Sequence, residues 1–240
     1  MSLRHFILGL SVSFGIAWMA VVVIPFFKMR NIAPVALTEE PDSPPFFPKR
    51  TGRVADGAKI YAENGCYVCH TQVVRPTYAG NDMFRPDWGG LKSDPDRGDT
   101  RRETNEFDFQ YEKFAQIGVN RIGPDLSNLG RRVESNYAPA PDSPTRWLYA
   151  HLYNPRYEAD HTKSGCPSFR FLFDEHKIGS GPAEDAVTFS DGKSPGDDNH
   201  VYVPSSDAKA LVSYLLSLKK DQPVPDSLNF AREKKEAAAK

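Results

Sequence analysis

The N-terminal part of the chain contains one long apolar run. Residues 6–27 (FILGLSVSFGIAWMAVVVIPFF) carry no charged side chain. As a helix rising about 1.5 Å per residue, this run would measure roughly 33 Å, enough to cross a hydrocarbon core of about 30 Å. A cleaved secretory signal has a shorter apolar region, of about 7–15 residues, followed by a small-residue cleavage site. The pattern therefore predicts a retained transmembrane helix within an anchor at residues 1–30.

Two shorter stretches have the periodicity of amphipathic helices. In residues 54–64 (VADGAKIYAEN), Ile60 and Tyr61 follow Gly57 by three and four positions, and Gly65 ends the pattern. Residues 207–220 (DAKALVSYLLSLKK) form the second stretch, for which Ser205 or Ser206 is the expected N-cap. Its last turn would contain Lys219 and Lys220, and one face would carry Leu211, Tyr214, Leu215 and Leu218. These two helices are expected to pack together in a mainly α-helical domain at residues 51–220.

The remaining segments are polar or rich in proline. Residues 31–50 contain five prolines, which predicts an extended tether. Residues 80–120 are rich in aspartate and arginine, and residues 177–204 are polar and rich in glycine, so both stretches are predicted to be surface loops that could alter a docking face. Residues 221–240 are expected to form a solvated, charged tail. The formal net charge of -1 gives no electrostatic reason to expect nucleic-acid binding.

Two of the three cysteines form a motif with a definite chemistry. Residues 66–70 read Cys-Tyr-Val-Cys-His, the pattern that attaches haem c: the thiols add to the haem vinyl groups and the histidine binds the iron. A structural zinc site would need a second ligand pair, but only Cys166 is left. A thioredoxin-like pair would need a βαβ setting, which the pattern does not indicate. The sequence therefore predicts one covalently bound haem c.

Three segments together resemble a known family. They are GCYVCHTQVVRP at 65–76, RIGPDLSNLGRR at 121–132 and HLYNPR at 151–156. In this order, and with the N-terminal anchor, they resemble the mono-haem c subunit (subunit II, FixO/CcoO-like) of cbb3-type cytochrome c oxidases. The resemblance covers roughly residues 61–172, the anchor and the closing helix. It implies a loop-rich, class I cytochrome c-like domain behind one transmembrane helix.

The resemblance also implies roles for individual residues. Cys66 and Cys69 would form the thioether bonds, and His70 would be the proximal ligand. Pro124 would lie against the haem and hold the loop of that ligand. Arg75 would act near a haem propionate or a partner subunit. The alternative for Arg75, and also for Arg131 and Arg132, is a solvated surface charge. His151 would be a packed, structural histidine.

The sixth ligand departs from the family pattern. Where the family has a methionine, residues 164–169 read Ser-Gly-Cys-Pro-Ser-Phe, so Cys166 occupies the ligand position. We expect Cys166 to bind the iron as thiolate, which would lower the haem potential relative to methionine. The alternatives are His161, His176, His200, Met83, no strong ligand at all, or Cys166 as an ordinary buried residue.

The function implied by the resemblance is electron transfer without independent catalysis. The partners would be a catalytic haem-copper oxidase subunit, other cytochrome c subunits or carriers, and the lipid bilayer. A haem-based sensor or small-molecule-reactive haem protein, or a tethered carrier of another quinol-oxidising complex, stay open as alternatives. Haem attachment implies a single-pass protein of the bacterial inner membrane with a periplasmic domain, although Arg4 before the span and Lys28 and Arg30 after it weakly favour the opposite orientation.

The anchor and its orientation can be tested together. Protease added to spheroplasts should digest the haem domain, and mass spectrometry of the mature protein should detect residues 6–27. A mature N-terminus near Ala36 would show that the apolar run is a removed signal peptide.

Overall fold

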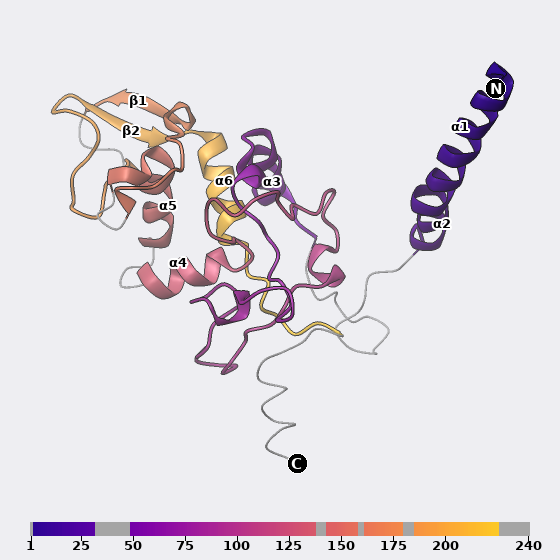
Figure 1. Ribbon diagram of the computed structural model, residues 1–240. Coiled ribbons are helices and arrows are strands. Elements are labelled where there is room, and N and C mark those ends of the chain that lie inside the picture. The colour runs from indigo at the N-terminus through magenta and orange to yellow at the C-terminus, as the bar shows by residue number, and fades with distance from the viewer. Residues whose placement is uncertain (1, 32–48, 138–142, 158–160, 180–184, 226–240) are drawn as a thin grey trace, which may run out of the picture. The chain divides into compact units, whose positions relative to one another are not determined.

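The computed structural model describes residues 2–31, 49–137, 143–157, 161–179 and 185–225 (Figure 1). The chain divides into two units, residues 1–45 and 46–240, and each is described by itself. Most of the expected tether (31–50) and of the expected tail (221–240) lies outside the described residues.

The first unit contains the apolar helix. It runs continuously from Leu3 to Met29 as α1 (Leu3–Trp18), a π-helical segment η1 (Met19–Val23) and α2 (Ile24–Met29). The π-helical segment precedes Pro25, whose nitrogen cannot donate the usual i to i−4 hydrogen bond, so the backbone bonds are rearranged at this point. The helix buries no residue, which leaves its apolar surface available to lipid. The predicted helix is present and is long enough to cross a membrane.

Two helices from opposite ends of the second unit form its centre. These are α3 (Gly52–Glu63) and α6 (Ser206–Leu216), which pack closely against each other. Gly57 permits this approach, because a Cβ atom there would lie 2.0 Å from the carbonyl oxygen of Ala210. The rings of Tyr61 and Tyr214 are fully buried at the contact, with centroids 5.4 Å apart.

Both predicted helices are thus present, and α6 has one of its two predicted N-caps but a different end. Ser205 is the N-cap, and its hydroxyl accepts a hydrogen bond from the amide of Ala208 at 3.3 Å. The helix ends at Leu216, four residues earlier than predicted. Lys220 therefore does not lie in a solvated last turn but is buried beyond the helix.

The rest of the second unit adds two helices and a small sheet. Helices α4 (Leu129–Tyr137) and α5 (Ser143–Tyr153) contact each other and α6. Strands β1 (Phe173–Lys177) and β2 (His200–Pro204) pair antiparallel, with Phe173 opposite Pro204. The prediction of a surface loop at 177–204 is wrong at its end, because Val201 and Val203 point into the protein, as their alternation in HVYVP could have indicated. Short 3₁₀ turns are η2 (Cys66–Val68), η3 (Asp82–Phe84), η4 (Glu106–Phe109), η5 (Pro155–Tyr157) and η7 (Arg170–Leu172).

The segment at 80–120 is irregular, as predicted, but it is not simply a surface loop. Several of its charged side chains are buried in pairs: Arg102 is 1% exposed and binds Asp108 through both terminal nitrogens. Asp82 is fully buried and is bound by Arg75 and Arg121. Burial of these charges is tolerated because each carboxylate has guanidinium donors in contact.

The close packing of α3 on α6 leads to a stability prediction. Gly57→Ala should lower the free energy of unfolding by about 1–3 kcal/mol, because the new methyl group collides with backbone that cannot move independently. Urea unfolding followed by circular dichroism would measure this change. Gly179→Ala, at a position with open space around the Cβ site, is the matched control and should change stability little. Equal stability of the two variants would contradict the proposed packing constraint.

Candidate functional site

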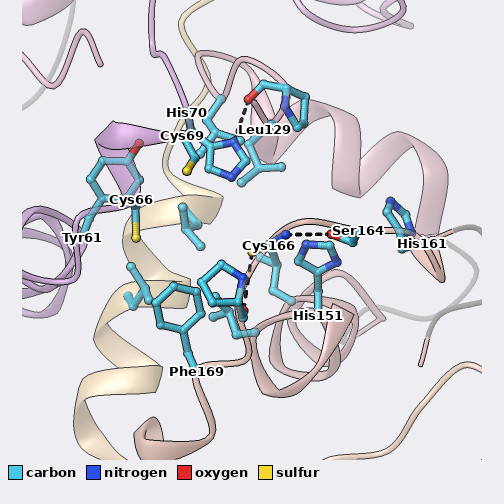
Figure 2. Close-up of a pocket in the computed structure, with 18 of the residues that line it drawn as sticks. Tyr61, Cys66, Cys69, His70, Leu129, His151, His161, Ser164, Cys166 and Phe169 are labelled. Carbon is cyan, nitrogen blue, oxygen red and sulfur yellow. Dashed lines mark hydrogen bonds between the residues drawn. The ribbon is translucent and has the colours of Figure 1, made fainter. Parts of the chain in front are cut away.

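The Cys-x-x-Cys-His loop begins directly after α3. Gly65 has φ +68, a left-handed conformation that favours glycine and turns the chain out of the helix. The 3₁₀ turn that follows is closed by hydrogen bonds from the amides of Cys69 and His70 to the carbonyl of Cys66, at 3.2 and 3.0 Å. This tight turn brings both thiols and the imidazole to the edge of one cavity (Figure 2).

A second segment, residues 117–126, is bound along this loop. This contact brings together the motifs at 65–76 and 121–132, which are far apart in the sequence. Four backbone hydrogen bonds connect the segments: Gln72 to Ile117 at 2.9 Å, Val119 to Tyr67 at 2.8 Å, Gly123 to Cys69 at 2.9 Å and Leu126 to Thr71 at 2.8 Å.

The orientation of His70 is determined by this second segment. Its Nδ1 lies 2.8 Å from the carbonyl oxygen of Pro124, which can only accept, so Nδ1 carries the hydrogen and Nε2 is left as the basic nitrogen. A Cβ atom on Gly123 would lie 2.2 Å from Cε1 of the imidazole, so the ring needs glycine there. Burial lowers the pKa of His70, which favours the neutral imidazole that can bind a metal.

The cavity beside these groups has a volume of about 650 Å³, within the usual range for ligand and cofactor sites. Helices α3, α4, α5 and α6 all contribute to its walls. Its apolar lining includes Leu126, Leu129, Val133, Leu148, Leu152, Leu211 and Leu215.

The wall across from His70 contains Cys166, His151 and His161 (Figure 2). The ring of Trp147 stacks on that of His151 at 4.8 Å, and the rings of His151 and His161 meet edge to face at 5.3 Å. The Nδ1 atoms of both histidines are buried without a hydrogen-bond partner. Burial lowers the pKa of His151 to about 4, so this ring is neutral at physiological pH. His151 is packed, as expected, but it also lines the cavity and its polar Nδ1 is unsatisfied.

Cys166 lies on a loop that Arg156 holds together. One terminal nitrogen of Arg156 donates to the carbonyl oxygens of Cys166 and Ser164, at 2.8 and 3.3 Å, and the other donates to the hydroxyl of Ser168 at 3.0 Å. Burial raises the pKa of the Cys166 thiol, with a further increase from Cys69 and an opposing effect from Arg156. Without a bound metal, the Cys166 thiol is therefore protonated at neutral pH. Burial likewise raises the pKa of Cys66 to about 12.

Arg75 does not line the cavity. Its guanidinium donates to the buried carboxylate of Asp82 at 3.0 and 3.1 Å, and Arg121 donates to the same carboxylate at 2.7 Å. Burial alone would raise the pKa of Asp82, but the hydrogen bonds from Arg75 and then Arg121 lower it overall. The role of Arg75 near a propionate or a partner subunit stays a prediction, and an internal carboxylate binds its partly exposed side chain.

The other residues considered as distal ligands lie away from the cavity. Met83 is buried in η3 and packs against Gly89. His176 is an exposed residue of β1. In β2, Nδ1 of His200 lies 3.0 Å from Oδ1 of Asp197. None of the three is among the residues that line the cavity in the described part of the chain.

Arg132 and Lys163 do line the cavity, a position that was not predicted from the sequence. A solvated charge was the alternative role for Arg132, but both of its terminal nitrogens donate to the carbonyl oxygen of Asp125, at 3.1 and 3.2 Å. Its neighbour Arg131 binds the buried carboxylate of Asp221 at 3.2 Å. The helical spacing of Arg132 from Leu129 was the signal that could have placed it on the cavity wall.

The residues present fit a haem. The thiols of Cys66 and Cys69 are free, His70 presents a basic nitrogen, and the walls are mainly apolar. The Nδ1 atoms of His151 and His161, which also line the cavity, are buried without a hydrogen-bond partner. A group that fills the cavity would supply packing contacts for the apolar walls and could supply partners for the unpaired polar atoms.

An apolar N-terminal helix and a small helical domain around such a cavity define a membrane-bound protein of the cytochrome c type. The family described as "Cytochrome C oxidase, mono-heme subunit/FixO" matches residues 10–191. No curated protein matches the chain. Because the family match covers most of the sequence, the chain belongs to the mono-haem subunits of cbb3-type cytochrome c oxidases, which are membrane-bound electron-transfer proteins. The resemblance, the mainly helical fold and the electron-transfer function are confirmed.

Proposed function

We propose that this chain carries one haem c, bound covalently by Cys66 and Cys69 with His70 as proximal ligand, and transfers electrons inside the oxidase complex. The observation that carries the proposal is the convergence of both thiols and the imidazole on one cavity of about 650 Å³. The haem supplies the one-electron redox chemistry when it is bound.

The chain's own residues would orient the group and exclude water. Pro124 keeps the hydrogen of His70 on Nδ1, so Nε2 would be the nitrogen that binds the metal. Arg132 and Lys163 carry positive charge at the cavity wall, which makes them further candidates for propionate binding alongside Arg75. The apolar walls keep the local dielectric low, which strengthens the effect of each nearby charge on the potential.

Cys166 is our proposed sixth ligand. Its support is the position across the cavity from His70, on a loop that Arg156 stabilises. Burial raises the pKa of the thiol, but a bound metal cation favours the deprotonated form, because thiolate and not thiol is the ligand. An anionic ligand stabilises ferric over ferrous iron, so the potential would be lower than with methionine.

Histidine is the competing ligand type on this wall. His161 was the next choice from the sequence, and His151 joins it because both rings line the cavity with an unpaired Nδ1. The same polar wall is the one observation that favours a haem sensor or a small-molecule-reactive haem. Binding of CO to the resting ferrous protein would support that second function.

The proposed location is the bacterial inner membrane, with the retained helix as a single-pass anchor and the haem domain in the periplasm. The proposed partners are the catalytic haem-copper subunit and other cytochrome c subunits or carriers. Family membership supports assembly into an oxidase, and co-purification with a copper-containing oxidase would distinguish this from a tethered carrier of another complex.

Covalent attachment has a direct test. On a denaturing gel stained for haem peroxidase activity, the stain should stay at the mass of the chain. The double variant Cys66→Ser, Cys69→Ser should lose it, because a hydroxyl cannot form the thioether bond. A stained band in the double variant would contradict the assignment, and Cys166→Ser, which keeps both attachment thiols, is the control.

The proximal side can be tested without changing a ligand. Gly123→Ala should displace the imidazole of His70, because the new Cβ would lie 2.2 Å from Cε1. We expect a loss of low-spin character in the visible spectrum of the haem protein, as the bond to the iron lengthens. Gly179→Ala, which has open space at its Cβ site and does not line the cavity, should leave the spectrum nearly unchanged.

The distal ligand is tested by Cys166→Met. Exchange of an anionic for a neutral ligand should raise the reduction potential by roughly a few hundred millivolts. This rise lies within the range of about 0.8 V that different axial ligands produce. Spectroelectrochemistry measures the potential, and the visible spectrum of the oxidised protein would show whether methionine has become the ligand.

Two variants serve as the comparison for Cys166→Met. His161→Ala and His151→Ala should leave the potential almost unchanged if Cys166 binds the iron. If Cys166→Met has no effect and one histidine variant changes the spectrum, that histidine is the ligand and Cys166 is an ordinary packed residue.

A further inference from the structure

The second unit contains another cavity, of about 290 Å³, between the start of α3 and the chain that follows α6. It shares no lining residue with the cavity proposed for the haem. Its walls include Lys49, Arg50, Glu112 and Lys220, so it is polar and charged where the first cavity is mainly apolar.

Lys220 is the unusual residue in this wall. It is 2% exposed, and its Nζ has no hydrogen-bond partner. The ring of Phe109 lies 3.9 Å from Nζ, and the nearest carboxylate oxygen, Oε1 of Glu112, lies 3.6 Å away. An ammonium group has three hydrogens to donate, and burial without acceptors is strongly unfavourable. Burial lowers the pKa of Lys220, and oxygen acceptors from a ligand in the cavity would offset this and favour the charged form.

The charge of the lining favours an anion over water alone. Four basic and two acidic side chains line the cavity, and one of the basic ones, Lys219, is paired with Glu134 outside the lining. Both carboxylates already have guanidinium partners: Glu112 binds Arg50 at 2.8 Å, and Asp108 binds Arg102. The N-terminal end of α3, which carries partial positive charge, also borders the cavity through Thr51, whose side chain makes no capping hydrogen bond.

The same wall also contains acceptors without donors. Oε2 of Glu112 and Oε1 of Gln110 are buried with no hydrogen-bond partner. Sulfate can only accept hydrogen bonds at neutral pH, so it would satisfy Lys220 but leave these two oxygens unpaired. Hydrogen phosphate carries accepting oxygens and one donating hydroxyl, so it would satisfy Lys220 and one of these two oxygens, which sulfate would not.

We propose that this cavity binds a phosphate group that keeps a hydroxyl, with Lys220 and Arg50 donating to its oxygens and Glu112 accepting from its hydroxyl. A bound phosphate would connect the start of α3 to the chain after α6 and so stabilise the pair of helices beside the first cavity. Inorganic phosphate fits this requirement, whereas the phosphodiester of a lipid headgroup has no hydroxyl to donate.

Calorimetric titration of the purified full-length protein in detergent tests the proposal. Inorganic phosphate should bind, and sulfate and dimethyl phosphate, at equal ionic strength, should bind at least tenfold more weakly. If phosphate does not bind, or if sulfate binds equally well, the proposal is wrong and the cavity holds water or an unselected anion. If dimethyl phosphate binds as well as phosphate, a lipid phosphodiester is the better candidate and the hydroxyl argument fails.

Variants locate the binding to this cavity. Lys220→Met should abolish phosphate binding, and Lys49→Gln, a change at an exposed position that does not disturb the core, should weaken it several-fold. Glu112→Gln should reduce the ratio of the phosphate affinity to the sulfate affinity, because an amide can donate a hydrogen bond to sulfate. Lys59→Met, on the exposed surface of α3, is the control and should bind phosphate like the wild type. Phosphate binding that persists in both Lys220→Met and Lys49→Gln would overturn the proposed site.

Discussion

The hydrogen bond between Nδ1 of His70 and the carbonyl oxygen of Pro124, 2.8 Å long, is the interaction on which the candidate site depends. It connects two segments that are 54 residues apart in the chain, and it decides which nitrogen of the ring is free to bind a metal. Gly123 makes the bond possible, since a side chain there would occupy the position of the imidazole. The backbone bonds on either side of this contact position the segment at 117–126 against the Cys-x-x-Cys-His loop.

Around this contact the domain is organised to enclose a space rather than to fill it. Tyr61, Leu211 and Leu215 belong both to the hydrophobic core and to the cavity wall, so the core and the proposed cofactor site are continuous. A helical domain this rich in loops has few regular elements to pack, and a large apolar cofactor would contribute the missing contacts. The stability of the domain and the occupancy of its cavity are therefore expected to be coupled.

The two sides of the cavity differ in kind. The proximal side is determined by backbone: a glycine, a proline carbonyl and several main-chain hydrogen bonds leave His70 one orientation. The distal side consists of side chains on a loop, with Cys166, His151 and His161 on one wall. Axial ligand identity strongly affects haem potential. In the proposed site, a single substitution on the distal wall would therefore change the potential and leave the covalent attachment on the proximal side intact.

The sequence by itself determined the features that depend on local pattern. The apolar helix, the helices at α3 and α6, an N-cap at Ser205 or Ser206 and the haem-attachment motif all follow from residues close together in the chain. Only the tertiary structure decided which charges meet. Arg75 binds the buried Asp82 instead of lining the cavity, Arg132 lines it instead, and Lys220 is buried at a second cavity. Residue type and spacing specify what a side chain can bind, but a long side chain can reach several partners, and the packing of distant segments selects among them.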